Sequence, residues 1–279
     1  MNARLLERGA VFVARWALSQ EGAPMSGRAS VVLPVVRGDG SRAALKLQDV
    51  DDETAGEGLA LRTWGGDGAV HLLAEDPETG TLLLERLDED RPLFTVPDVM
   101  DATRILAELL ARLTAVPAPA GLRRLDAVVA GLFERLPPVL AELESRGADE
   151  DARLLKDCAA ALREVADETG DRLLHWDLHF ENVLAAGREP WLAIDPKPLA
   201  GDPCFEVLPA LWSRFGEGRL TRRFDLLTEA LGVDRERARA WTLGRVLQGS
   251  LWRVEAGQVP NTEQLAIAEM LLGRRASAG

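Results

Sequence analysis

The sequence predicts an α+β protein with two lobes, a small β-rich lobe over residues 1–87 and a larger, mainly helical lobe over residues 88–279. In the first part, short runs of valine and leucine alternate with turn-forming residues, which is typical of β-hairpins. In the second part, apolar residues recur every three or four positions over long stretches, which is typical of amphipathic helices. The 279 residues suffice for one large domain or for two lobes, each with its own core.

The first lobe is expected to contain two helices and two hairpins. Residues 3–16 are typical of a short helix, and SVVLPVVRGDGSRAALKLQ (30–48) predicts a hairpin with GDG as its turn. Pro34 inside the first strand indicates an edge or irregular position. DDETAGEGLALRTW (51–64) predicts a helix, because acids in the first turn suit the helix dipole. AVHLLAED and TLLLERL, separated by PETG, predict a second hairpin over residues 69–87.

The second lobe is expected to be built from helices. DVMDATRILAELLARLTAV, at residues 98–116, has its apolar side chains near helical spacing. Within the helical stretch 122–146, the two prolines at 137–138 predict a break or kink, because proline has no backbone N–H. The stretch 172–198 interrupts the helices as the one β-like insertion of this half. Further helices are expected at residues 150–169, 219–231, 234–256 and 261–274.

Composition narrows the class of protein. Hydrophobic residues make up 47% of the chain and charged residues 28%, which is ordinary for a folded protein. No apolar run approaches the roughly 18–20 residues that cross a bilayer, and charges interrupt the N-terminal MNARLLERGAVFVARW. We therefore expect a cytoplasmic protein without a membrane partner. Cys158 and Cys204 are far apart and are expected to be buried thiols.

The charge balance indicates the kind of partner. The chain has 33 basic and 45 acidic residues, which gives a formal net charge of −12. Binding to nucleic-acid backbones needs a basic surface, so we expect no nucleic-acid partner. An acidic surface suits a cationic small molecule. The sequence does not predict the oligomeric state.

The most informative stretch is RLLHWDLHFENVLAAGREPWLAIDPKP, at residues 172–198. His175, Asp177 and His179 alternate, so on a strand they would share one face and could bind zinc. The chain has only one further histidine, His71, which argues against a two-metal hydrolase. Histidines and aspartates in loops also often just cap backbone groups. The third interpretation is a kinase catalytic loop, because H-x-D-x-x-x-x-N precedes a strand that ends in an aspartate.

An independent lysine favours the third interpretation. Lys46, in AALKL on a strand of the first lobe, is the only lysine before Lys156. Its stem could pack while its head reaches water, or it could hold the phosphates of a nucleotide. Transfer of a phosphoryl group from ATP to an alcohol needs a cation, oxygen ligands for Mg²⁺ and an acceptor for the hydroxyl proton. These groups are present, in chain order, as Lys46, Asp177, Asn182 and Asp195.

LLHWDLHFENVL followed by PWLAIDPKPLAGDP resembles the aminoglycoside phosphotransferase family, in particular its streptomycin 6-kinase and hydroxyurea phosphotransferase group. In that group the loop commonly reads HGDLHHGNVL. GAVHLL at 68–73, LLLERL at 82–87 and the lysine strand extend the resemblance over nearly the whole chain, and its most specific part is 173–203. The resemblance implies a protein-kinase-like bilobal fold. It also implies an enzyme that uses ATP and Mg²⁺ to phosphorylate a hydroxyl group of a small, often cationic antibiotic.

The resemblance assigns roles in the catalytic loop. Asp177 would be the catalytic base or would orient the acceptor hydroxyl. Asn182 and Asp195 would be the ligands of Mg²⁺. His175 would hold the loop by hydrogen bonds, and Asp202 would maintain loop geometry.

The resemblance also places the nucleotide. Lys46 would bind phosphate with Glu57 as its partner, and residues 85–87, from Glu85 to Leu87, would be the hinge that meets adenine through backbone groups. The phosphate loop, EGAPMSGRAS, lacks the G-x-G-x-x-G of protein kinases. Ser26 and Gly27 there could offer backbone donors to phosphate, or could simply form a hairpin turn.

Three positions depart from the family's pattern and leave the acceptor open. Trp176 replaces the usual glycine and could either wall the acceptor pocket or pack in the core. Phe180 and Glu181 also differ. A non-aminoglycoside acceptor (a peptide antibiotic, hydroxyurea, an amino sugar or a metabolite) and a nucleotide-binding pseudokinase are the alternatives. Acids that could meet a cationic acceptor, each also expected as a solvated surface residue, are Asp149, Glu150, Asp151, Glu206, Glu217 and Glu255.

Overall fold

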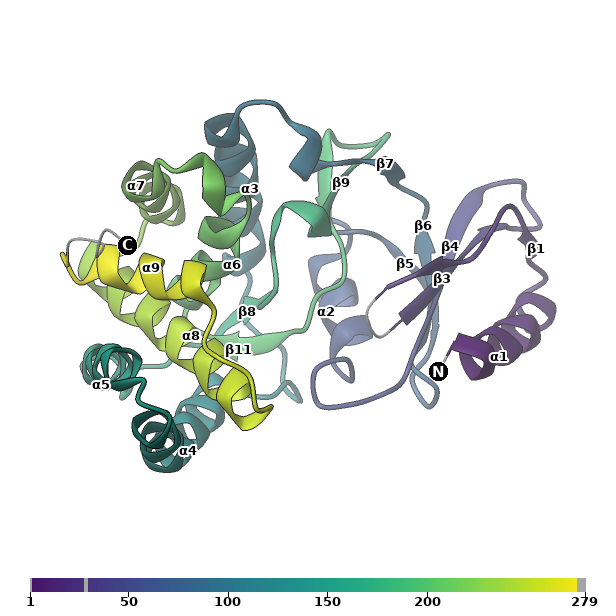
Figure 1. Cartoon of the computed structure of the whole chain (residues 1–279). Helices are drawn as coiled ribbons and strands as arrows, with labels where there is room; N and C mark the ends of the chain where they lie inside the picture. The colour runs from purple at the N-terminus through teal and green to yellow at the C-terminus, as the bar shows by residue number, and fades with distance from the viewer. Residues whose placement is uncertain (1, 28–29, 275–279) are drawn as a thin grey trace.

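The computed structural model describes residues 2–27 and 30–274 of the chain. Figure 1 shows a sheet-containing N-terminal lobe on one side of the molecule and a helical C-terminal lobe on the other. These lobes, which differ in size, are called the N-terminal half and the C-terminal half below. The expected α+β class and bilobal architecture are confirmed.

The N-terminal sheet has six strands and is antiparallel. The two predicted hairpins, β3–β4 and β5–β6, are both present. Pro34 pairs with Ala44 of the neighbouring strand, and it lies between the residues of β3 that pair with β1 and those that pair with β2. The strand order is β1-β3-β4-β6-β5, with β2 also paired to β3. The strands are β1 Ser19–Gln20, β2 Met25–Ser26, β3 Ser30–Val36, β4 Arg42–Gln48, β5 Leu72–Asp76 and β6 Thr81–Glu85.

Helix α1, Asn2–Arg15, covers one face of this sheet. Leu5 of the helix shares a buried cluster with Leu45 and Leu47 of β4. Because successive side chains of a strand point to opposite faces, Lys46 points away from α1. The alternation in AALKL therefore directs the one lysine of the strand toward the rest of the molecule.

Helix α2, Glu57–Trp64, lies between the sheet and the helical half (Figure 1). The sequence predicts a start near residue 51, and this prediction is wrong. The side chain of Asp51 accepts hydrogen bonds from the N–H groups of Glu53 and Thr54, both 2.9 Å long. These bonds turn the chain before the helix, and Gly56 then serves as its N-cap. The acidic residues at 51–53 therefore belong to the chain turn that precedes the helix, and not to the first turn of the helix.

The C-terminal half contains the expected helices. Of the break or kink that the sequence predicts at Pro137 and Pro138, the break does not occur, because helix α4 runs through both prolines. The long helix α8 is buried along much of its length and contacts α4, α5, α6, α7 and α9, which makes it the centre of this half. The short helix α6 has no counterpart in the sequence-based prediction. The helices are α3 Val99–Thr114, α4 Leu125–Ser145, α5 Asp149–Arg163, α6 Val207–Trp212, α7 Leu220–Leu231, α8 Arg235–Glu255 and α9 Thr262–Leu271.

The C-terminal half also contains short strands, which form two small sheets of their own. Strand β9 pairs with both β10 and β7, and β8 pairs with β11. In this half the sequence predicts β structure only within 172–198, so β7 and β11 are additions; β7 has the sequence DEDRP, which lacks any apolar alternation. Its pairing with β9 is what makes it a strand. The strands are β7 Asp88–Pro92, β8 Arg172–Leu174, β9 Val183–Ala185, β10 Trp191–Ala193 and β11 Leu199–Gly201.

Two expectations from composition can be compared with the structure. Cys158 and Cys204 are buried free thiols, as predicted. Within residues 2–27 and 30–274, no helix is both long and apolar enough to span a membrane.

Candidate active site

Lys46 and Glu57 form a buried ion pair between the sheet and α2. The Nζ atom of Lys46 lies 2.7 Å from both carboxylate oxygens of Glu57, and the two residues are 4% and 1% exposed. Gln48, on the same face of β4, donates to Glu57 Oε2 at 2.6 Å. Burial alone would lower the pKa of Lys46, but the charges of Glu57 and Asp195 raise it above its ordinary value. The side chain of Lys46 is therefore positively charged, and its ammonium group is fixed in place by Glu57.

Asp195 brings the helical half to the same lysine. Its Oδ1 atom lies 2.5 Å from Lys46 Nζ, although the two residues are far apart in the chain. Burial alone would raise the pKa of Asp195, but the charge and hydrogen bond of Lys46, together with the charge of Lys197, hold it below its ordinary value. The backbone of Asp195 is left-handed, with φ of 58°, and this sparsely populated conformation directs its carboxylate to the lysine.

Hydrogen bonds tie the loop around Asp177 to the segment that carries Asp195. The Nε2 atom of His175 lies 2.9 Å from the carbonyl oxygen of Ile194, and the N–H of Lys197 donates to the carbonyl of His175 at 3.0 Å. The carbonyl of Asn182 accepts from the N–H of Ile194, while its Nδ2 donates to the carbonyl of Asp177, both at 2.9 Å. These hydrogen bonds hold the segments that carry Asp177, Asn182 and Asp195 beside one another.

The zinc-hydrolase interpretation is wrong. Residues 175–179 do not form a strand, and Trp176 has a left-handed backbone with φ of 73°, which breaks the alternation of the three polar side chains. Burial lowers the pKa of His175 to about 4, so its ring is neutral, and its Nε2 faces a carbonyl. In the described part of the chain, no three His, Cys, Asp or Glu side chains gather as a metal site.

Trp176 packs in the core, which answers one open question. Its indole ring is buried, and the guanidinium carbons of Arg123 and Arg245 lie 4.3 and 4.5 Å from the ring centre. The backbone N–H of Trp176 donates to Glu206 Oε1 at 2.7 Å, and its backbone carbonyl accepts from Arg245 at 2.8 Å. A left-handed backbone at a tryptophan costs about 1–2 kcal/mol of folding free energy. The hydrogen bonds to the N–H and C=O of Trp176 stabilise this conformation. They hold the residue next to Asp177.

Glu206 differs from the expected solvated acid. It ends the 3-10 helix Pro203–Glu206 and is fully buried. Burial raises its pKa to about 7, although the N–H of Trp176 and the charge of Arg245 act in the opposite direction. Its Oε2 atom has no hydrogen-bond partner among the residues described. Glu206 therefore supports the loop from inside and does not face an acceptor.

The residues of the predicted hinge, 85–87, differ in whether their polar groups already have hydrogen-bond partners. The N–H of Glu85 donates to the carbonyl of His71 at 3.0 Å, and its carboxylate binds Arg188 at 2.8 Å. Both groups are thus already engaged. In contrast, neither the N–H nor the C=O of Leu87 has a hydrogen-bond partner in residues 2–27 and 30–274. The backbone N–H and C=O groups of Arg86 likewise have no partner there, so Arg86 and Leu87 are the two residues of this segment whose backbone groups are not already hydrogen-bonded.

The predicted phosphate loop contains a hairpin. Ser26 pairs with Val31, and the N–H of Gly27 donates to the carbonyl of Ser30 at 2.9 Å. The amide of Gly27 is therefore used by the turn, as one of the two interpretations expects. Residues 28 and 29 of this loop lie outside the described residues.

Sequence reasoning missed the roles of three side chains at this site. Lys197 Nζ lies 2.7 Å from Asp177 Oδ2, and Glu206 and Arg245 hold the peptide of Trp176. A signal existed only for Lys197, which is one of three lysines in the chain and stands two positions after Asp195. Nothing in the local sequence distinguishes Glu206 or Arg245 from surface residues.

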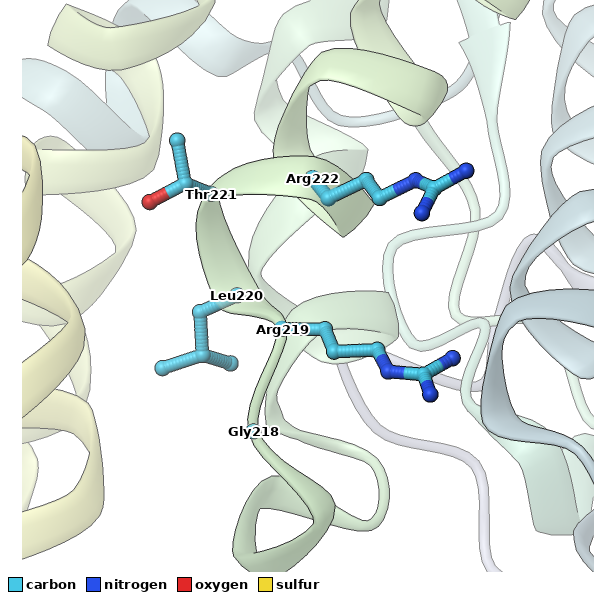
Figure 2. A pocket seen from close by; sticks show the side chains of 5 residues that line it. All are labelled: Gly218, Arg219, Leu220, Thr221 and Arg222. Atoms are coloured by element: carbon cyan, nitrogen blue, oxygen red, sulfur yellow. The ribbon is translucent and has the colours of Figure 1, made fainter.

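A separate surface hollow lies at the start of α7. It is lined by Gly218, Arg219, Leu220, Thr221 and Arg222. Figure 2 shows the side chains of Arg219 and Arg222 pointing the same way, with Leu220 and Thr221 on the other side of the ribbon. Arg219 already pairs with Asp98 at 3.8 Å. None of the residues joined around Lys46 and Asp177 lines this hollow, so the candidate site is elsewhere.

The bilobal architecture and a lysine that joins a helix glutamate to a strand-end aspartate define a protein-kinase-like phosphotransferase. Comparison with known families gives the particular one. A family model described as "aminoglycoside/hydroxyurea antibiotic resistance kinase" matches residues 15–257. The chain belongs to this family and is an antibiotic kinase by descent.

Two similar proteins have names that agree with this family. The chain is 59% identical to a hydroxyurea phosphotransferase of Kitasatospora aureofaciens over 270 residues, which cover 96% of this chain and 78% of the relative. It is 51% identical to a streptomycin 6-kinase of Streptomyces glaucescens over 268 residues, covering 93% of this chain and 86% of the relative.

Solved structures share the fold at low identity. A thermostable mutant of aminoglycoside phosphotransferase APH(4)-Ia, in ternary complex with ADP and hygromycin B, superposes with a TM-score of 0.65 at 15% identity and covers 96% of this chain and 99% of its own. A choline/ethanolamine kinase family protein from Mesorhizobium loti gives a TM-score of 0.59 at 17% identity, covering 95% and 92%.

Proposed function

We propose that the protein transfers the γ-phosphoryl group of ATP, with Mg²⁺, to a hydroxyl group of a small, cationic antibiotic such as streptomycin. The observation that carries the proposal is the position of Lys46, which contacts Glu57 in one half and Asp195 in the other. Identity of 51% to streptomycin 6-kinases supports the choice of acceptor. An acidic chain with a net charge of −12 suits a cationic acceptor.

The nucleotide would bind between the halves. We assign nucleotide binding to residues 1–87 and catalysis and acceptor binding to residues 88–279. Lys46 would contact the phosphates, with Glu57 holding its ammonium group in place. The backbone of Leu87 would meet adenine, because its N–H and C=O make no hydrogen bond with the described residues, whereas Glu85 would support the hinge through Arg188.

Asn182 and Asp195 fit the requirements of Mg²⁺. The Nδ2 atom of Asn182 is used by the carbonyl of Asp177, so the amide directs its oxygen, a hard ligand, elsewhere. Asp195 is held as a carboxylate beside Lys46. Mg²⁺ is commonly bound by one or two protein oxygens together with substrate phosphates and water, so these two residues suffice. The ion would neutralise charge on the phosphates during transfer.

Asp177 would act on the acceptor. Its carboxylate is partly exposed, and Asn182 holds its carbonyl group. It would orient the acceptor hydroxyl and accept its proton, while Lys46 stabilises charge on the phosphates. We also propose that the protein acts in the cytoplasm and without nucleic acid or membrane partners.

The test is an ADP-release assay with ATP and Mg²⁺ against streptomycin, other aminoglycosides, cationic peptide antibiotics, amino sugars and hydroxyurea. We expect streptomycin to stimulate ADP release, and Asp177→Asn to lower turnover about 100- to 10,000-fold with nucleotide binding kept. Asp167→Asn, at an exposed acid, is the matched control. Full activity of a folded Asp177→Asn variant would refute the assignment.

Hydroxyurea is the second candidate acceptor, because identity to the hydroxyurea phosphotransferase is the higher of the two, at 59%. Stimulation by hydroxyurea and not by streptomycin would select it. Stimulation by a peptide antibiotic or an amino sugar would select another acceptor. Nucleotide binding without turnover on any acceptor would favour a pseudokinase.

A further inference from the structure

Lys197 contacts Asp177 directly. It follows Asp195 by two residues, and its backbone N–H is held by the carbonyl of His175 at 3.0 Å. Its Nζ atom donates to Asp177 Oδ2 at 2.7 Å. The side chains of Lys197 and Asp177 are 30% and 28% exposed, so both can be reached by a ligand.

The contacts of Asp177 leave one oxygen open. Its carbonyl oxygen accepts from Asn182 Nδ2 at 2.9 Å, and its Oδ2 accepts from Lys197. Across the described part of the chain, no group donates to Oδ1. A carboxylate attached by a single bond to Cβ can rotate, and an ammonium group on one oxygen selects the orientation of the other.

We propose that Lys197 is a positioning residue of the reaction, which holds Asp177 Oδ2 so that Oδ1 faces the acceptor hydroxyl. In the step that this orientation serves, the hydroxyl oxygen forms a bond to the γ-phosphorus. The bond from that phosphorus to the bridging oxygen of ATP breaks, and its electron pair leaves with ADP. The hydroxyl proton passes to Asp177 Oδ1. The proposal rests on the phosphotransferase function given above.

Simple stabilisation does not account for the pair. Ion pairs between partly exposed side chains contribute little to folding, so a variant without Lys197 is expected to fold. A role in nucleotide binding predicts a different outcome, namely a raised KM for ATP. The positioning role predicts instead a lower kcat that depends on the presence of the Asp177 carboxylate.

The experiment compares wild type, Lys197→Met, Lys197→Arg, Asp177→Asn and the double variant Asp177→Asn/Lys197→Met. Rates are measured as single turnovers with γ-labelled ATP and saturating streptomycin, or hydroxyurea where the ADP-release assay selects that acceptor. We expect Lys197→Met to lower the rate about 10- to 100-fold, since small misplacements of a reacting group cost this much, with KM for ATP within about 2-fold. Lys197→Arg should recover most of the rate, because it keeps a charged donor. Lys156→Met, at a surface lysine paired with Glu144 at 2.8 Å, is the matched control.

The double variant gives the decisive comparison. If Lys197 acts through Asp177, adding Lys197→Met to Asp177→Asn changes the rate by no more than about 2-fold, because residues that act as a unit are non-additive. An unchanged rate in Lys197→Met would overturn the proposal, as would an equal loss in both backgrounds or an effect on KM for ATP alone. Failure of the phosphotransferase function would differ, since wild type itself would then transfer no label.

Discussion

Replacing Glu206 by glutamine tests whether the burial of its carboxyl group makes the free energy of unfolding depend on pH. The carboxyl group has an ordinary pKa of 4.5, and burial raises it to about 7 in the folded protein. A folded-state pKa above the unfolded value means that stability from this group is complete below pH 4.5. It is lost as pH rises through about 7. Because one pKa unit is worth about 1.4 kcal/mol, the full loss is about 3 kcal/mol.

His175 acts in the opposite direction over a similar range. Burial lowers its pKa from 6.5 to about 4. Its stability contribution is therefore complete above pH 6.5 and is lost as pH falls through about 4. The wild-type profile is the sum of both groups and is expected to be flat, so only a comparison with Glu206→Gln isolates the carboxyl group. Glutamine keeps an oxygen for the N–H of Trp176, which donates to Glu206 at 2.7 Å.

The assay is urea unfolding followed by the fluorescence of the seven tryptophans, at several pH values from 5 to 8. The free energy of unfolding of Glu206→Gln, minus that of wild type, should rise by about 2–3 kcal/mol from pH 5 to pH 8. Glu229→Gln, at an exposed acid on α7, is the control and should follow wild type. Parallel profiles for Glu206→Gln and wild type would refute the reasoning.

Three further predictions concern the same site. Lys46→Met should weaken ATP binding about 10-fold or more, since a charged hydrogen bond is worth about 1.5–3 kcal/mol; calorimetric titration beside Lys156→Met measures this, and equal affinities would contradict it. Asp195→Asn should raise the Mg²⁺ concentration for half-maximal ADP release about 10-fold or more, with Asp167→Asn as control; an unchanged Mg²⁺ dependence would remove Asp195 from the metal site. Trp176→Gly should lower the free energy of unfolding by about 2–4 kcal/mol, because losing a buried indole costs about 3–5 kcal/mol and relieving the left-handed backbone returns about 1. Urea unfolding measures it, and a more stable variant would show that backbone strain outweighs packing.

The sequence by itself determined the parts of the fold that have strong local patterns. Helices such as α3 and α8 follow from apolar spacing, and the hairpins follow from turn residues between apolar runs. Strand alternation also places Lys46 on the face opposite Leu45 and Leu47, whereas only the structure shows that α1 covers the face of these two leucines. The order Lys46, Asp177, Asn182 and Asp195 was enough to indicate phosphoryl transfer.

Only the tertiary structure decided which groups meet and which are buried. Strand β7 has no apolar pattern and forms because β9 supplies its backbone partner. Glu206 has the local sequence of a surface acid, yet its burial follows from packing beneath Trp176. The contact of Lys197 with Asp177 needs two loops to be joined through His175 and Ile194. Burial and contacts between distant segments depend on how whole elements pack, and local residue patterns do not carry that information.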